Sequence, residues 1–314
     1  GIEELHEIAR QRRKRRERIL WAAFLGGFAV LFGAIWAGIS WNTDGERAPR
    51  SAGEPGPLEP GSGGREEEIG VLWTDKPVLG MVLAGENAYL ATDDLGLTIV
   101  NVAEPGAPVK VGQLDTSGKA SDVAVAGATA YVAAGTGGLR IVDVSHPDRP
   151  VERGSVPTPG QAMAVDVSPG TACVADGEGL RVIDVTAPDE PRVRAALQGA
   201  VVDVAVTQRS AYLADKERGL LVVDLQRLDA PRVIARVKSA KQGLSVAVDG
   251  SRVYFGAQDL LQILDVSDPA EPRKMGQYTV SRLEVTSTNA RGTRRVGRVE
   301  QVLPAGDRLL IARG

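Results

Sequence analysis

The stretch GLRIVDVSHPDRP, residues 138–150, recurs with small changes at a spacing of about 41 residues. Its copies occupy residues 96–108, 138–150, 179–191, 219–231 and 260–272. A second series keeps step at separations of 42, 42, 39 and 42, and consists of Tyr89, Tyr131, Cys173, Tyr212 and Tyr254. Repeats of this length, built around short β-strand patterns, predict a propeller or a solenoid, in which no unit buries its faces alone.

Each repeat reads as four short β-strands. In the second copy they cover residues 122–126, 130–134, 139–144 and 151–156, with glycine, aspartate and proline between them. The apolar runs are nearly continuous, so neighbouring sheets should cover both faces of each small sheet. The first strands are rich in alanine, valine and glycine, which suits crowding around a narrow channel. We therefore predict an all-β propeller of about six four-stranded blades.

The two ends of the repeat region predict how the ring closes. Residues 68–75 fit an outer strand, and residues 301–305 and 308–312 fit the first two strands of a sixth unit. We expect N- and C-terminal strands to close the last blade together, because this covers sheet edges that would otherwise be exposed.

The repeated block resembles the LVIVD-repeat propellers of bacteria and archaea over roughly residues 67–314. Asn101 replaces the usual aspartate, Leu228 a proline and Leu260 a glycine, each in an otherwise intact copy. The resemblance implies a propeller. It also implies a cell-surface or exported protein, because the family is known mainly from such proteins, without one defined chemistry.

The recurring glycine and aspartate can be explained by turn geometry. Glycine before the third strand permits the positive φ of a tight turn. An aspartate followed by Ser or Thr and Pro can accept hydrogen bonds from nearby backbone N–H groups. We interpret the series as turn residues, the alternative being a ring of carboxylates that binds cations: Asn101, Asp143, Asp184, Asp224 and Asp265.

Residues 19–41 are uncharged and would measure roughly 34 Å as a helix, which predicts one N-terminal transmembrane α-helix. The basic segment before it, residues 1–18, predicts a cytoplasmic N-terminus and an extracytoplasmic propeller. A cleaved signal peptide is the alternative, although its apolar run should be shorter. Small residues at Gly26, Gly33 and Ala37 are candidates for packing against another transmembrane helix. Residues 42–66 read as a Gly/Pro-rich linker, and residues 67–314 as the propeller.

Ionisable and nucleophilic residues form no recognisable catalytic motif. His6 and His146 are the only histidines, which argues against a histidine triad or a histidine-rich metal centre. Cys173 occupies a tyrosine position inside a strand and is expected to fill the core. The net charge is −3 for the chain and −6 beyond residue 18, which gives no nucleic-acid footprint. We expect no enzymatic activity, no cofactor and no bound metal.

Two surface features are candidate sites. The first is a channel-mouth site at the ends of the inner strands, with Asp122, Asp203, Ser245 and Gln301 as candidates beside the equivalent Gly80 and Ala164; small polar residues could also simply solvate the channel. The second is a long basic stretch, residues 279–297, where a rigid scaffold could present a loop to an acidic partner. Its candidate contacts are Arg282, Arg291, Arg294, Arg295 and Arg298.

These observations favour a bacterial single-pass protein of the cytoplasmic membrane, with its propeller in the periplasm or outside the cell. We expect a non-catalytic binding or scaffolding subunit of a membrane protein complex, for which a respiratory or photosynthetic electron-transfer complex is a candidate host. Its partners would be other membrane subunits and the lipid bilayer. One alternative is a solitary surface protein that binds a glycan, peptide or small ligand at the channel mouth. Another is a hydrolase or lyase that uses carboxylates such as Asp122 and Asp203.

Overall fold

The computed structural model describes residues 76–279 except Pro105, Ala240 and Asp259, together with Leu72 and Thr74. It also describes the backbone of four strands outside that range: β1 (Ala23–Leu25), β2 (Phe28–Val30), β23 (Val299–Ala305) and β24 (Arg308–Arg313). Nearly all of the repeat region therefore has a structure with side chains.

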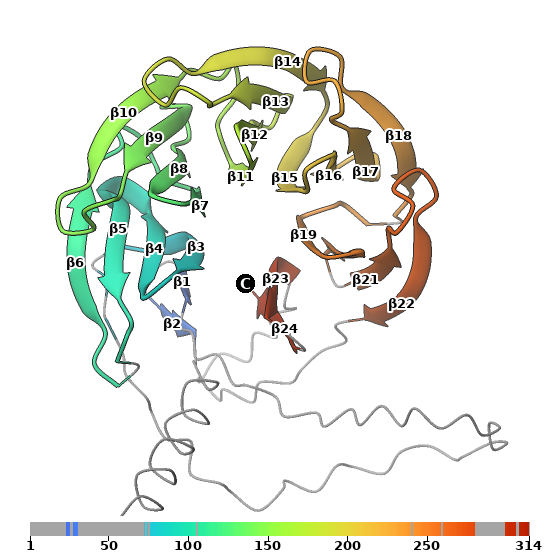
Figure 1. Cartoon of the computed structure of the whole chain (residues 1–314). Coiled ribbons are helices and arrows are strands. Elements are labelled where there is room, and N and C mark those ends of the chain that lie inside the picture. Colours follow the sequence, from blue (N-terminus) through green and yellow to red (C-terminus); the bar gives the residue numbers. More distant parts are fainter. Residues whose placement is uncertain are drawn as a thin grey trace, which may run out of the picture.

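Five four-stranded antiparallel sheets follow one another around a ring, as Figure 1 shows. Blade 1 contains β3 (Val78–Ala84), β4 (Asn87–Thr92), the short 3-10 helix η1 (Asp93–Leu95), β5 (Gly96–Asn101) and β6 (Val109–Leu114). Blade 2 contains β7 (Asp122–Ala126), β8 (Thr129–Ala133), β9 (Leu139–Asp143) and β10 (Val151–Val156). Blade 3 contains β11 (Ala164–Ser168), β12 (Thr171–Ala175), β13 (Gly179–Asp184) and β14 (Arg192–Gln198).

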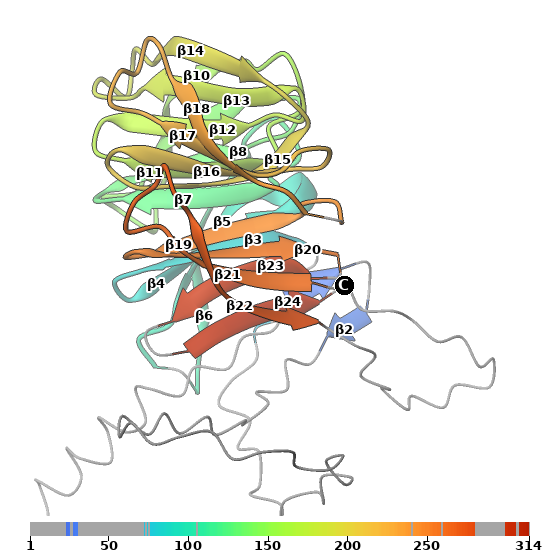
Figure 2. The ribbon, with the colours of Figure 1, turned by 90° about the vertical axis from the view of Figure 1, so that its right-hand side faces the viewer.

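Blade 4 contains β15 (Val201–Val206), β16 (Ser210–Asp215), β17 (Gly219–Asp224) and β18 (Arg232–Val237). Blade 5 contains β19 (Ser245–Asp249), β20 (Arg252–Ala257), β21 (Leu260–Asp265) and β22 (Arg273–Thr279). The first strand of each blade lies innermost and the fourth lies on the rim (Figure 1). Seen edge-on in Figure 2, the strands run roughly along the ring axis. The predicted all-β propeller is thus confirmed.

The number of complete blades differs from the prediction. Strands β23 and β24 pair only with each other and lie beside β19, in the position of a sixth blade. The described residues therefore form five four-stranded blades and one two-stranded sheet, where about six four-stranded blades were predicted. The strand expected at residues 68–75 lies outside the described residues, apart from Leu72 and Thr74, which belong to no strand.

The structure also differs from the predicted transmembrane helix at six positions. Strands β1 and β2 form an antiparallel pair, with Leu25 opposite Phe28. The sequence between them is Gly26-Gly27, and a pair of glycines favours a two-residue hairpin over a helix. Among the described residues, no helix is long and apolar enough to span a bilayer. The other positions of residues 19–41 lie outside the described residues.

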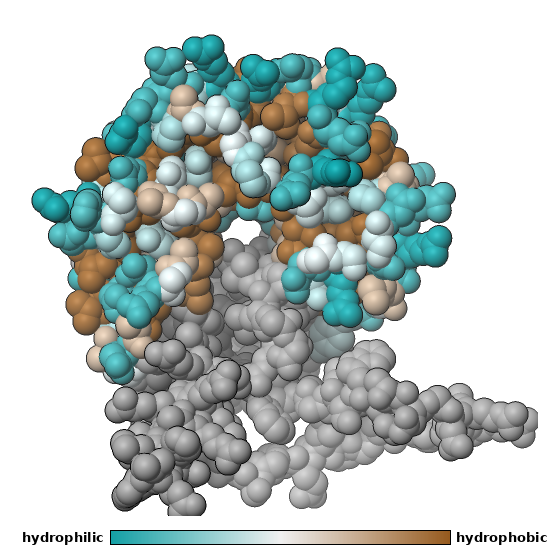
Figure 3. Space-filling view, in the orientation of Figure 1, coloured by the Kyte–Doolittle hydropathy of each residue, from teal (hydrophilic) through white to brown (hydrophobic). Residues whose placement is uncertain are grey.

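The core lies between neighbouring blades. The middle strands are buried along nearly their whole length, as in β12, where all five residues are buried. The rim strands alternate between exposed and half-buried positions, as in β18. Figure 3 shows hydrophobic residues between the blades and hydrophilic ones around the rim. The continuous apolar runs of the sequence thus correspond to strands covered on both faces.

The turn residues behave as predicted. Gly138 has φ +73°, and a Cβ there would lie 2.2 Å from the Val156 carbonyl oxygen, so a side chain would push the rim strand away. In blade 5, where Leu260 replaces the glycine, Gln258 adopts the positive φ nearby. The residue that ends each third strand accepts a backbone N–H two residues further on, at distances of 2.9–3.1 Å, in Asn101, Asp143, Asp184, Asp224 and Asp265. Their side chains therefore close turns.

Candidate functional site

Three carboxylates on successive inner strands link blades 2 to 5. Asp122 lies on β7, Asp166 on β11 and Asp203 on β15. One oxygen of each accepts a backbone N–H from the next blade: Val165 N to Asp122 Oδ2 (3.0 Å), Val206 N to Asp166 Oδ2 (2.7 Å) and Val246 N to Asp203 Oδ2 (2.7 Å). We call these three residues the inner-strand carboxylates. Each is a hydrogen-bonded tie between two blades.

Side-chain alternation explains why these carboxylates reach forward to the next blade. Val123 packs in the cluster between blades 1 and 2, and Ala124 in the cluster between blades 2 and 3. Successive residues of a strand point to opposite faces, so Asp122 faces blade 3 together with Ala124. The same rule directs Asp203 toward blade 5, because Val204 packs toward blade 3.

The second oxygen of Asp166 and of Asp203 accepts a hydrogen bond from its own strand. Asp166 Oδ1 accepts the Val167 N–H at 2.7 Å, and Asp203 Oδ1 accepts the Val204 N–H at 2.8 Å. Asp122 also packs directly on blade 1, since a Cβ on Gly80 would lie 2.6 Å from Asp122 Oδ1. Only glycine fits at that position beside the carboxylate.

Burial controls the electrostatics of the cluster. Loss of hydration raises the pKa of Asp122 to about 7 and that of Asp166 to about 6, against the opposing effect of their backbone hydrogen bonds. Burial also raises the pKa of Asp203 well above its usual value, and repulsion from Asp122 and Asp166 adds to the increase. Cys173 lies on the neighbouring strand β12, where burial and the nearby Asp166 raise the pKa of its thiol. Its side chain is buried in the core, as predicted. The pKa of Asp203 thus depends on the charges of Asp122 and Asp166, whereas burial is the main cause of the raised pKa of Asp166.

The structure brings together only part of the predicted channel-mouth site. Asp122 and Asp203, two of the candidates, are close enough for the charge of Asp122 to raise the pKa of Asp203. Ser245 occupies the equivalent position on β19 but is 1% exposed, and its Oγ has no hydrogen-bond partner among the described residues. Val246 packs toward blade 4, so Ser245 faces the opposite side, where β23 lies. Ala164 is buried, and Gln301 is on β23, whose side chains lie outside the described residues.

Asp166 was missed by the sequence analysis. It lies two residues beyond the channel-end position that was compared between repeats, and its blade has Ala164 at that position. The sequence does indicate it, because Asp166 is an acidic residue in an otherwise apolar inner strand. The alternation of side chains along that strand places it on the face toward the next blade. No three acidic, histidine or cysteine groups in the described part of the chain are arranged to hold a metal ion.

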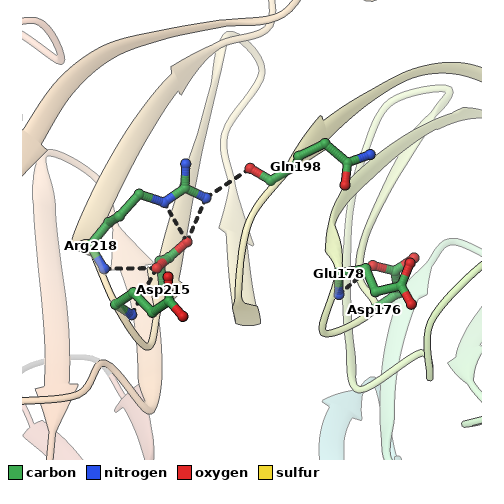
Figure 4. A network of polar contacts seen from close by, with 6 residues as sticks. Asp176, Glu178, Gln198, Asp215 and Arg218 are labelled. Atoms are coloured by element: carbon green, nitrogen blue, oxygen red, sulfur yellow. Dashed lines mark hydrogen bonds and ion pairs between the residues drawn. The ribbon is translucent and has the colours of Figure 1, made fainter.

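Ion pairs of buried aspartates form a second set of polar contacts, and Figure 4 draws the pair of Asp215 and Arg218. Asp215 Oδ2 accepts the Arg218 Nε–H at 2.8 Å, and Arg218 Nη2 donates to the Gln198 carbonyl of blade 3 at 2.8 Å (Figure 4). Burial alone would raise the pKa of Asp215, but hydrogen bonds from Arg218 and Glu217 lower it overall. This pair links blade 4 to blade 3.

A similar pair in blade 3 has an incomplete counterpart in blade 2. Asp176 Oδ2 accepts the Arg181 Nε–H at 2.6 Å, and both side chains are buried. Arg140 holds the position of Arg181 in blade 2, but Ala134 replaces the aspartate. Arg140 Nη1 donates to Glu152, and in the part of the chain that the structure describes its buried Nε has no partner. The two blades thus differ by one carboxylate beside an equivalent arginine.

The remaining predicted sites lie outside the described residues. They are the transmembrane packing positions Gly26, Gly33 and Ala37, and the basic stretch with Arg282, Arg291, Arg294, Arg295 and Arg298.

Solved structures that resemble this chain share its fold at low sequence identity. A protein from Lactobacillus plantarum is 14% identical with a TM-score of 0.59, over 67% of this chain and 73% of that one. The computationally designed Ika8 protein is 9% identical with a TM-score of 0.56, over 75% and 67%. The Swd1 β-propeller domain from Myceliophteria thermophila is 11% identical with a TM-score of 0.53, over 66% and 73%.

No curated protein matches the sequence. The family model of the LVIVD repeat matches five times, at residues 80–116, 117–158, 159–194, 198–231 and 242–280. These matches cover more than half of the chain and coincide with the five blades. The chain therefore belongs to the LVIVD repeat family of β-propeller proteins.

Proposed function

We propose that this propeller is a non-catalytic binding or scaffolding subunit of a membrane protein complex. Residues 19–41 would anchor it in the bacterial cytoplasmic membrane, and the ring would lie in the periplasm or outside the cell. Its partners would be other membrane subunits, and respiratory or photosynthetic electron-transfer complexes are the hosts to test first. The anchor would limit the search for a partner to the membrane plane and raise its effective concentration.

The observation that carries the proposal is how the inner-strand carboxylates are used. Both oxygens of Asp166 and of Asp203 accept backbone N–H groups, one from their own strand and one from the next blade. Acidic groups that could serve a reaction therefore hold blades together. A ring held in this way is a rigid support, and its loops and rim remain for partners.

Support for the anchor comes from the sequence. An uncharged run of 23 residues follows a segment with a net charge of +3. As a helix, such a segment would be long enough to cross a bilayer, and it has the basic flank expected on the cytoplasmic side.

The test is extraction of the full chain from its native membrane in a mild detergent, followed by native gel electrophoresis. We expect the chain to migrate with other membrane subunits, identified by mass spectrometry. The Asp122→Asn/Asp203→Asn double variant should migrate in the same way, because the carboxylates act inside the ring. A monodisperse monomer would refute the scaffolding role.

One observation favours a second candidate, chemistry or ligand binding in the channel. The pKa of Asp122, about 7, lies in the range of general acids and bases at neutral pH. A channel enzyme or ligand-binding site predicts that the double variant loses turnover or ligand binding while its complexes stay intact. Loss of either property in that variant would replace the scaffolding proposal.

A further inference from the structure

A hollow of about 460 Å³ opens at the junction of blades 2 and 3. Its walls come from the connection between the two blades, with Thr158, Pro159, Gln161 and Met163, and from the loop between β12 and β13, with Asp176 and Glu178. Two neighbouring blades thus build it jointly.

Backbone hydrogen bonds hold the walls in place. Gly135 of blade 2 and Ala162 before blade 3 exchange two of them, at 3.0 and 2.9 Å. The Glu178 N–H is donated to Asp176 Oδ1 at 3.1 Å, and the Glu178 carbonyl accepts the Gly199 N–H at 3.0 Å. Glu178 is therefore fixed at the rim on both sides of its Cα, beside Asp176 (Figure 4). The hollow is formed before any ligand arrives.

The hollow carries one uncompensated negative charge. Asp176 is 1% exposed and is neutralised by the buried Arg181. Glu178 is exposed, and in the described part of the chain its carboxylate has no hydrogen bond and no ion pair. A carboxylate held at the rim by its backbone, with free lone pairs, is suited to a cationic donor.

The other walls suit an aliphatic stem that carries the cation. Met163 is 37% exposed despite its apolar side chain, and Pro159 lines the same hollow. Thr158 donates its hydroxyl to the Gly160 carbonyl at 2.9 Å, which leaves its oxygen free to accept. Gln161 offers an exposed amide oxygen. A guanidinium has five donors for these acceptors, and its methylene stem can lie along Met163.

We propose that this hollow binds an arginine side chain in an exposed segment of a protein partner. The inference rests on the proposed binding role and specifies one contact of it. Lysine would bind more weakly, because its ammonium cannot span two acceptors in one plane.

The test uses the full chain and acetyl-arginine amide, followed by ligand-observed NMR. Acetyl-citrulline amide is the uncharged comparison of the same shape. We expect saturable binding of the arginine compound, no binding of citrulline, and binding weakened about fivefold in Glu178→Gln, as for an exposed charge-assisted pair. Met163→Ala should weaken it by a smaller factor. Glu178→Gln should fold normally, because the carboxylate it removes is exposed and unpaired.

Glu217 is the matched control, since it holds the position of Glu178 in the equivalent loop of blade 4 and does not line the hollow. Glu217→Gln should bind arginine amide like the unchanged protein. Absence of saturable binding, or equal affinity in Glu178→Gln, would overturn the inference. If arginine binds but the chain is extracted as a monomer, arginine binding in the hollow is supported and the scaffolding role is refuted. If complexes form and Glu178→Gln leaves arginine binding unchanged, only the hollow fails.

Discussion

Replacing Asp166 by asparagine should change how the stability of the ring depends on pH. The pKa of Asp166 is raised from 3.8 to about 6, chiefly by burial. The folded protein therefore holds this proton more tightly than the unfolded chain does. The stability that the group contributes is complete below about pH 3.8 and is lost as the pH rises to about 6. An asparagine side chain cannot titrate, so the Asp166→Asn variant lacks this loss.

The magnitude follows from the shift in pKa. A change from 3.8 to about 6 corresponds to about 3 kcal/mol at most, and the partial exposure of Asp166 reduces this to about 1–2 kcal/mol. Asparagine keeps one acceptor but turns an amide toward the second N–H donor, which costs about 1–3 kcal/mol at every pH. The constant cost shifts the whole curve, whereas the titration changes its slope.

The assay is urea unfolding of the full chain and the variant at pH 4, 5, 6, 7 and 8. We expect the free energy of unfolding of Asp166→Asn, relative to the unchanged protein, to rise by about 1–2 kcal/mol between pH 4 and pH 7. Asp184→Asn is the control. Hydrogen bonds from Thr186 lower the pKa of Asp184, so that variant should show a constant difference above pH 5. A constant or falling difference for Asp166→Asn would refute the assignment.

Two further predictions concern the free energy of unfolding, measured in urea. Gly138→Ala should lower the free energy of unfolding by about 3 kcal/mol or more, because the new Cβ would lie 2.2 Å from the Val156 oxygen. Gly85→Ala is the control, since Gly85 also has a positive φ but open space around it, and it should cost about 1 kcal/mol. Equal costs would contradict the steric reason. Ala134→Asp should give Arg140 Nε its missing partner, and a double-mutant cycle with Arg140→Met should give a favourable coupling of about 1–2 kcal/mol. Zero coupling would show that the carboxylate does not reach.

The sequence predicted the turns, whose conformation depends on residues that are close together in the chain. The positive φ of Gly138 and the turn closed by Asp143 are local, since glycine lacks a Cβ and a short carboxylate reaches the N–H two residues on. The ties between blades join residues about 40 positions apart, such as Asp166 and Val206. Such a tie forms only if the aspartate side chain points to the face of its strand that packs against the next blade. A comparison of single positions between repeats shows neither the direction of the side chain nor the neighbouring blade.

The structure describes six positions of residues 19–41, too few to test whether the segment spans a membrane. Its lack of charge predicted a helix, while the structure pairs Phe24 with Ala29 in a short hairpin. Gly26 was interpreted as a candidate for helix packing, and Gly26-Gly27 was not considered as a turn. Apolar composition fits a helix and a strand equally well, and only a turn signal or a length criterion separates them. About six four-stranded blades were predicted, and the described residues form five, with the two-stranded sheet of β23 and β24 in the sixth position.

The ties formed by Asp122, Asp166 and Asp203 are distributed unevenly around the ring. Among the described residues, Gly80 of blade 1 and Ser245 of blade 5 hold the position of Asp122 and Asp203, and neither forms such a tie. Under mechanical force applied at the two ends of the described ring, blade 1 should peel away first. The middle junctions should then break together in one larger step in an optical trap. Blades built from the same repeat would therefore separate at different forces.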